Sequence, residues 1–119
     1  CAEGWHVPSD LEYTILTDYL GGLSVAGGKM KEEGTVHWDS PNTGATNESG
    51  FTALPGGFYH PHDDEGLKFQ GYASYFWSST EHNKISGFAW AGYLNADQST
   101  IYIRNYSKSI YYSIRCIKD

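Results

Sequence analysis

Two segments in the first third of the chain have the hydrophobic spacing of helices. Ser9 and Glu12 form a capping-box pattern before the first segment, since Ser9 can accept from a free helical N–H while Glu12 reaches back. Gly21-Gly22 ends this segment, and one apolar face is expected to pack on the core: Leu11, Ile15, Leu16, Tyr19 and Leu20. A shorter helix is predicted over residues 25–33, where Gly27-Gly28 permits close packing against its neighbours.

The second half of the chain changes to short apolar runs that are typical of strands. Three consecutive aromatic residues within residues 74–79 predict a buried central strand. Polar turns separate three further predicted strands: residues 88–94, 99–104 and 110–117. The pattern therefore predicts an α+β fold in which two helices pack on a short, twisted antiparallel sheet.

The last predicted strand has two distinct faces. The two-residue period of a strand places one set of side chains together on the inner face: Ile110, Tyr112, Ile114 and Cys116. The alternate positions are Tyr111, Ser113 and Arg115. Tyr111 is therefore expected to point outwards.

Residues 37–57 join the two halves and have neither helical nor strand periodicity. The segment nevertheless carries Trp38, Phe51 and Leu54 and few charges. Disordered linkers lack such residues, because they bury too little apolar surface to offset the entropy of the chain. The segment is predicted to be a long ordered loop, a kind of loop that is commonly functional.

Composition narrows the class of protein. A chain of 119 residues supports a single domain, and 16% aromatic residues with 14 glycines indicate a loop-rich fold. No apolar run approaches the roughly 18 residues of a membrane-spanning helix. The first residues lack a signal-peptide pattern, which leads us to expect a mature domain or an excised fragment.

Two cysteines, Cys1 and Cys116, frame the sequence. In an oxidising compartment such a pair predicts one disulfide, which would contribute roughly 4–5 kcal/mol by restricting the unfolded chain. A reactive thiol or a metal ligand is the alternative use of these residues.

The net charge of −6 is unevenly distributed. Residues 1–81 hold twelve acidic and three basic residues, whereas residues 82–119 hold two acidic and five basic ones. Either this asymmetry belongs to a solvated surface, or the two parts have different roles. A nucleic-acid partner is excluded, because it would require a dense basic face.

Catalytic signatures are scarce. Residues 60–65 (HPHDDE) place two histidines beside three carboxylates, but two histidines flanking a proline rarely complete a zinc site, and an exposed acidic turn is expected instead. The sequence contains no nucleophile elbow, phosphate-binding glycine loop or zinc-binding helix motif. We therefore expect a protein that is not an enzyme.

Five motifs carry a resemblance that extends over the whole chain: CAEGWHVPS at residues 1–9, GGKMK at 27–31, the loop at 37–57, FWSSTE at 76–81 and SIRCIKD at 113–119. Together they resemble the Fibrobacter succinogenes major paralogous domain, a family of secreted bacterial modules. The resemblance implies a C-type lectin-like fold, close to the sulfatase-modifying group, and a secreted or cell-surface location.

The same resemblance bears on cofactors. The sulfatase-modifying relatives hold calcium, so Asn42, Asn47 and Glu48 in the ordered loop are weak candidates for a cation, with hydrogen bonds that hold the loop as the alternative. Their oxidase activity depends on cysteines near a substrate groove, and this chain has none to spare. No cofactor is otherwise expected, and the sugar-binding motifs of vertebrate C-type lectins are absent.

Residues 82–119 depart most from the family pattern and are rich in Tyr, Ser, Asn and Ile. Tyrosine supplies rigid contact area while Ser and Asn supply adaptable hydrogen bonds, as in an antibody paratope. The predicted contact residues are Trp90, Gly92, Asn95, Tyr102, Arg104, Asn105, Tyr106 and Tyr111, on a scaffold formed by residues 1–81 with Trp5, Trp38, Phe51 and Trp77. An ordinary strand pair with a polar face is the alternative interpretation.

Some proteins of the implied fold are diversified by retroelements that rewrite adenine-containing codons, and the residues of this tail are those that such rewriting produces. The sequence thus favours a ligand-binding module whose partner is a protein or a glycan on another cell, without membrane insertion. A carbohydrate-binding adhesin module and a purely structural module are the alternatives, and a hydrolase is the least favoured.

Overall fold

The computed structural model describes residues 1–119 and has an α+β architecture with two helices and three small antiparallel sheets. Its elements are β1 (Trp5–His6), α1 (Asp10–Tyr19), α2 (Leu23–Met30), β2 (Phe58–Tyr59), β3 (Leu67–Lys68), β4 (Ala73–Glu81), β5 (Phe88–Asn95), β6 (Tyr102–Ser107) and β7 (Ile117–Lys118). The predicted fold class is confirmed at this level. Neither helix has the length and apolar character needed to span a bilayer.

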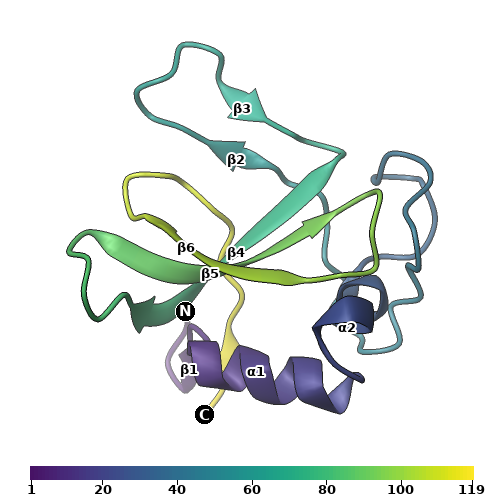
Figure 1. The fold of residues 1–119 in the computed structure, drawn as a ribbon, viewed down its shortest axis with the longest axis horizontal. Coiled ribbons are helices and arrows are strands. Elements are labelled where there is room, and N and C mark those ends of the chain that lie inside the picture. Colours follow the sequence, from purple (N-terminus) through teal and green to yellow (C-terminus); the bar gives the residue numbers. More distant parts are fainter.

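The two ends of the chain lie together beside α1 (Figure 1). β1 pairs with β7, and the disulfide between Cys1 and Cys116 closes a sequence separation of 115 residues. The predicted disulfide is confirmed. Three side chains, here called the latch, add to this connection between the chain ends: His6 contacts Asp119 at 2.6 Å and Glu12 at 2.9 Å.

Helix α1 begins as predicted, with Ser9 and Glu12 forming a complete capping box. The Thr80 side chain of the FWSSTE motif also accepts a hydrogen bond from the Asp10 N–H at 2.9 Å. The predicted buried face is correct for Leu16 and Leu20, which pack in or against the core, but wrong for Leu11, Ile15 and Tyr19, which are exposed. Tyr13 and Thr17 are buried in their place. The predicted and observed stripes both have helical spacing, and Thr17 is buried at little cost because its hydroxyl bonds the Thr14 carbonyl.

Helix α2 is shorter than predicted, because Lys31 adopts an extended conformation and ends it. The expected close approach at its glycines is confirmed. A Cβ on Gly27 would lie 2.6 Å from the Thr100 carbonyl carbon, and one on Gly28 would lie 2.3 Å from the Gly44 oxygen. Only glycine fits where the long loop and the β5–β6 loop meet this helix.

The loop at residues 37–57 is ordered, as predicted. Trp38 is 1% exposed and donates through Nε1 to the Ala53 carbonyl at 2.9 Å. The loop is hydrogen-bonded along α2, with Thr46 N–H donating to the Gly28 carbonyl at 3.0 Å. The loop is therefore part of the core.

The central sheet has the strand order β4-β5-β6, so the strand at residues 74–79 is buried as predicted but lies at an edge, and β5 is the middle strand. The third strand starts three residues later than predicted, because residues 96–101 turn back towards α2, where Ile101 N–H donates to the Leu23 carbonyl at 2.9 Å. Residues 110–117 do not form the predicted strand: they make isolated bridges such as Tyr59 to Tyr111, and only Ile117 enters a strand. Ile114 is accordingly 58% exposed rather than inward-facing, while Tyr111 points outwards as predicted.

The register divides the central sheet into two faces. On the helix face, defined by Phe76, Gly92, Leu94 and Ile103, the apolar side chains pack with α1, α2 and Trp38 in one core cluster. The opposite side, the tyrosine face, carries Tyr75, Tyr93, Tyr102, Arg104 and Tyr106. In Figure 1, α1 lies on one side of the sheet and the β2–β3 hairpin on the other.

Candidate functional site

The tyrosine face contains an uninterrupted row of stacked side chains across all three strands. Tyr75 lies opposite Tyr93, with ring centroids 4.8 Å apart, and Tyr93 lies opposite Tyr102 at 5.8 Å. The Arg104 guanidinium carbon is 5.6 Å from the Tyr102 centroid and ends the row. Strand pairing places these rings side by side, because directly opposed residues share one face at about 5 Å.

Polar groups border the exposed end of the row. Tyr72 donates to the Asp97 carboxylate at 2.8 Å, and Tyr102 donates to the side chain of Gln98. Asn95 donates to the Tyr93 hydroxyl at 3.2 Å and accepts from the Asp97 N–H at 3.0 Å. The β5–β6 loop thereby fixes the positions of the tyrosine hydroxyls.

The other end of the tyrosine face is closed by aromatic packing. Tyr112 stacks on Tyr75 at 4.6 Å and contacts Trp77 at 4.7 Å, while Phe58 from β2 meets Tyr75 edge-on. Burial raises the pKa of the Tyr75, Tyr106 and Tyr112 hydroxyls above the ordinary value. These hydroxyls therefore stay protonated at neutral pH.

The structure brings together only some of the contact residues proposed from the sequence. Tyr102, Arg104 and Tyr106 share the tyrosine face. Trp90 and Asn105 are register partners on the opposite face, and Trp90 stacks against His82 at 5.8 Å.

The remaining proposed residues lie elsewhere. Gly92 is buried, and a Cβ there would lie 3.3 Å from the Ile101 side chain, so Gly92 serves packing. Asn95 is buried as a support for Tyr93. Tyr111 belongs to a separate exposed pair, stacked on Tyr59 at 5.6 Å.

Sequence reasoning missed Tyr72, Tyr93 and Asp97. The two-residue period in β5 could have found Tyr93, because it alternates with the inward-facing Gly92 and Leu94. No local signal relates Tyr72 to Asp97, which lie 25 residues apart. The expected scaffold residues differ in burial: Trp38 is buried, whereas Trp5, in β1, is 47% exposed.

The weak cation candidates in the long loop have other partners. Asn47 donates to the Thr52 hydroxyl at 2.9 Å and accepts from the Thr52 N–H at 2.8 Å. Glu48 faces the Lys29 ammonium at 3.5 Å. Asn42 donates to the Glu32 and Gly34 carbonyls, and only its Oδ1 lacks a partner. These contacts hold the loop, which is the alternative role given to these residues above.

A lysine side chain occupies the carbonyl cluster at the centre of the molecule. Lys31 is fully buried, and its ammonium donates to three carbonyls, those of Thr43 (2.9 Å), Asn95 (3.0 Å) and Gln98 (3.0 Å). Burial lowers its pKa to about 8, an effect that Asp97 opposes. This one cation joins the long loop to the strand and loop that carry the tyrosine face.

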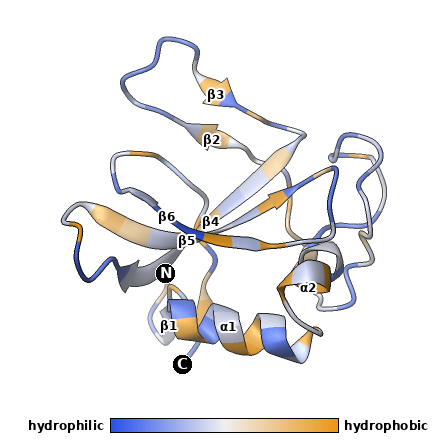
Figure 2. Cartoon of the chain, in the orientation of Figure 1, coloured by the Kyte–Doolittle hydropathy of each residue, from blue (hydrophilic) through white to orange (hydrophobic).

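The histidine-rich segment lies in the hydrophilic turn between β2 and β3 (Figure 2). Asp63 and Glu65 both pair with Lys68, and the Lys68 contact lowers the pKa of Asp63. His60 accepts a long hydrogen bond from the His62 N–H at 3.4 Å. The local interactions of this turn are thus ion pairs and backbone contacts.

No curated protein and no solved structure matches the chain. A family model does match: the Fibrobacter succinogenes major domain aligns with residues 1–118. Because the match spans nearly the whole sequence, from the disulfide at Cys1 to β7, the chain belongs to the Fibrobacter succinogenes major domain family.

Proposed function

We propose that this protein is an extracellular ligand-binding module that uses the exposed end of the tyrosine face to bind a protein on another cell. The observation that carries the proposal is the row of Tyr93, Tyr102 and Arg104 held in register across the sheet. Rigid tyrosines flanked by polar groups bind proteins at a small entropic cost.

A protein partner suits this row better than a glycan. Sugar rings stack on a free aromatic face, but the faces of Tyr93 are occupied by Tyr75 on one side and Tyr102 on the other. The row therefore presents ring edges and hydroxyls, together with the Arg104 guanidinium. Tyr111, 61% exposed on the outer side of Tyr59, is the better candidate for glycan stacking.

Two features support the extracellular location and the finer fold assignment. A disulfide such as Cys1–Cys116 persists in oxidising compartments, which favours a secreted or surface-displayed protein. The long ordered loop, the paired termini and the two helices are compatible with a C-type lectin-like arrangement, which we propose for this chain.

Cell binding tests the proposal. Fluorescently labelled protein is incubated with intact bacterial cells, untreated or pretreated with protease or with periodate. We expect binding that protease abolishes and periodate leaves intact. The variant Tyr93→Ala/Tyr102→Ala/Arg104→Ala should lose at least ten-fold in affinity.

The matched control carries Val36→Ala and Lys84→Ala at exposed positions away from the row and should bind normally. Equal binding by the triple variant would contradict the proposal. Loss of binding after periodate, together with loss in Tyr111→Ala, would instead identify a glycan-binding adhesin.

Retroelement diversification is a second proposal, and the structure makes it more specific. Ile101 and Leu94 belong to the buried core, whereas Tyr102, Arg104 and Tyr106 share the tyrosine face. If the tail is diversified, population sequencing of the gene should find substitutions at the face codons and none at the two core codons. Uniform divergence along the gene would leave a fixed binding module.

A further inference from the structure

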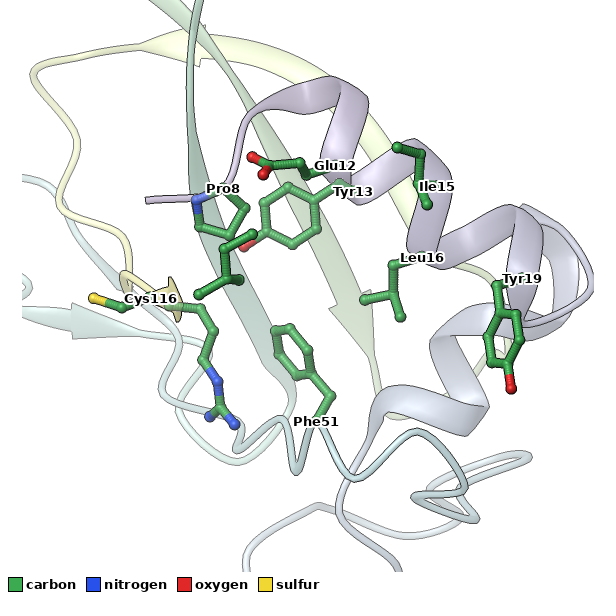
Figure 3. Close-up of a pocket in the computed structure, with 10 residues that line it drawn as sticks. Pro8, Glu12, Tyr13, Ile15, Leu16, Tyr19, Phe51 and Cys116 are labelled. Atoms are coloured by element: carbon green, nitrogen blue, oxygen red, sulfur yellow. The ribbon is translucent and has the colours of Figure 1, made fainter. Parts of the chain in front are cut away.

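An apolar groove runs beside α1 (Figure 3), on the side of the molecule that holds the chain termini (Figure 1). Its volume is about 470 Å³, within the range of small-molecule sites. The walls come from α1 (Ile15, Leu16 and Tyr19), from Phe51 in the long loop and from Arg115 and Ile117 in the C-terminal segment.

The groove exists because α1 leaves exposed part of the face that its hydrophobic pattern predicts to be buried. Ile15 and Tyr19 are 61% and 87% exposed, while Leu16 and Phe51 form a floor that packs on the core. Figure 3 shows Leu16 of the helix and Phe51 of the loop pointing towards each other, with Ile15 and Tyr19 also on α1. No segment of the chain covers the apolar side chains of this groove.

One cation in the groove has no anionic partner. The Arg115 guanidinium lies 4.8 Å from the centroid of the Phe51 ring, and none of the ion pairs in the molecule includes it. The carboxylate of Glu12 is already engaged by His6 and by the Ser9 N–H. Arg115 is therefore free to bind an external carboxylate through two parallel hydrogen bonds.

A second polar group at the groove also lacks a partner. Tyr13 is 3% exposed, and its hydroxyl makes no hydrogen bond. In Figure 3 this hydroxyl points towards Pro8, at one end of the groove. An unpaired buried hydroxyl is unfavourable, so a small shift that admits a polar ligand atom would be favoured.

We propose that this groove binds an apolar monocarboxylate of small-molecule size, with the hydrocarbon part on Leu16, Ile15 and Phe51 and the carboxylate on Arg115. Charge complementarity selects an anion over a neutral or cationic amphiphile. The groove lies on the helix side of the sheet, so this site is distinct from the tyrosine face.

Titration with simple amphiphiles tests the proposal. The backbone amide signals of the intact, disulfide-bonded protein are followed by NMR during addition of octanoate, octan-1-ol or octylammonium below their micelle concentrations. We expect octanoate to bind most tightly and octylammonium most weakly, with the largest shifts in α1 and residues 115–117. Affinity should fall from octanoate to butanoate, because fewer methylenes are buried.

Two variants sharpen the test. Arg115→Gln should weaken octanoate binding about ten-fold and leave octan-1-ol binding unchanged, whereas Lys118→Gln, a cation outside the groove, should change neither. Ile15→Glu places a carboxylate at an exposed position of the wall and should abolish octanoate binding even if the first variant fails to fold.

Three results would overturn the proposal: no saturable octanoate binding, equal affinity for octanoate and octan-1-ol, or shifts centred away from α1. Binding of an apolar peptide that ends in a carboxylate, without octanoate binding, would assign the groove to a protein segment instead. The Tyr93→Ala/Tyr102→Ala/Arg104→Ala variant should bind octanoate normally, which separates this proposal from the one above.

Discussion

The two faces of the central sheet are built from the same three strands but are closed in different ways. On the helix face, Phe76 and Leu94 are buried by α1, α2 and the long loop, which is itself anchored by Trp38. On the tyrosine face, Tyr112 and Phe58 cover Tyr75, but the row beyond it remains at the surface. The helix face is therefore buried at Phe76 and Leu94. The tyrosine face is buried at Tyr75 and reaches the protein surface at Arg104.

Because of this difference, we expect the helix face to contribute most of the stability and the exposed end of the tyrosine face to bind the ligand. Close contacts on the helix face leave no room for new atoms, as the glycines of α2 demonstrate. Side chains at the exposed end of the tyrosine row contact one another and the polar side chains at its border, without being enclosed by other elements. Substitutions should therefore be costly on the helix face and tolerated at the exposed end of the tyrosine face.

Truncating one side chain on each face tests this difference in stability most directly. Phe76→Ala removes a ring that packs edge-on against Phe51 at 5.2 Å and should lower the free energy of unfolding by about 4 kcal/mol. Tyr102→Ala should lower it by about 1 kcal/mol, the size of an aromatic pair at the surface. Urea unfolding of both variants measures the contrast, and equal losses would refute it.

The buried lysine provides the next largest effect. Lys31→Met leaves the Thr43, Asn95 and Gln98 carbonyls without their donor and should lower the free energy of unfolding by about 3 kcal/mol. Lys29→Met is the matched control, since Lys29 makes only a surface ion pair and should change stability by less than about 1 kcal/mol. A loss below about 1 kcal/mol for Lys31→Met would show that the bonds from Lys31 to the carbonyl cluster do not stabilise the fold.

The contact between α2 and the long loop can be tested by adding a single methyl group. Gly28→Ala would normally stabilise a helix, but the new Cβ would lie 2.3 Å from the Gly44 oxygen. We expect a loss of about 2 kcal/mol in thermal or urea unfolding, as for other overpacked positions. Ser24→Ala, at an exposed position of the same helix, should be neutral or slightly stabilising.

The smallest expected effect concerns the latch at the chain ends. Asp119 and Glu12 raise the pKa of His6, so its contribution is complete below pH 6.5 and is lost as the pH rises through the raised value. The Ser9 N–H and His6 lower the pKa of Glu12 to about 2, so its contribution is complete above pH 4.5 and is lost as the pH falls towards 2. The latch is thus strongest between pH 4.5 and 6.5.

The pH dependence of the latch can be measured with a His6 variant. Urea unfolding of His6→Gln should show a larger deficit against the parent protein at pH 5.5 than at pH 8. An identical deficit at both values would mean that the His6 contacts do not depend on its charge.

Much of the fold could be predicted from local patterns. The capping box at Ser9, the disulfide, the ordered loop and the buried strand around Phe76 depend on neighbouring residues or on chain composition. The site was harder to predict, because Tyr102 could be identified from its residue type but its partner Tyr93 depends on strand register. A shift of one residue in that register would have moved Tyr93 to the core.

The sequence by itself determined the family, the class of fold and the start of the first helix at its capping box. Only the tertiary structure decided which stripe of α1 is buried, why Lys31 lies among carbonyls, and where Tyr72 meets Asp97. The physical reason is that capping and turn formation involve residues a few positions apart, whereas burial depends on which distant surfaces fit together. The groove beside α1 and the row of tyrosines both arise from that long-range fit.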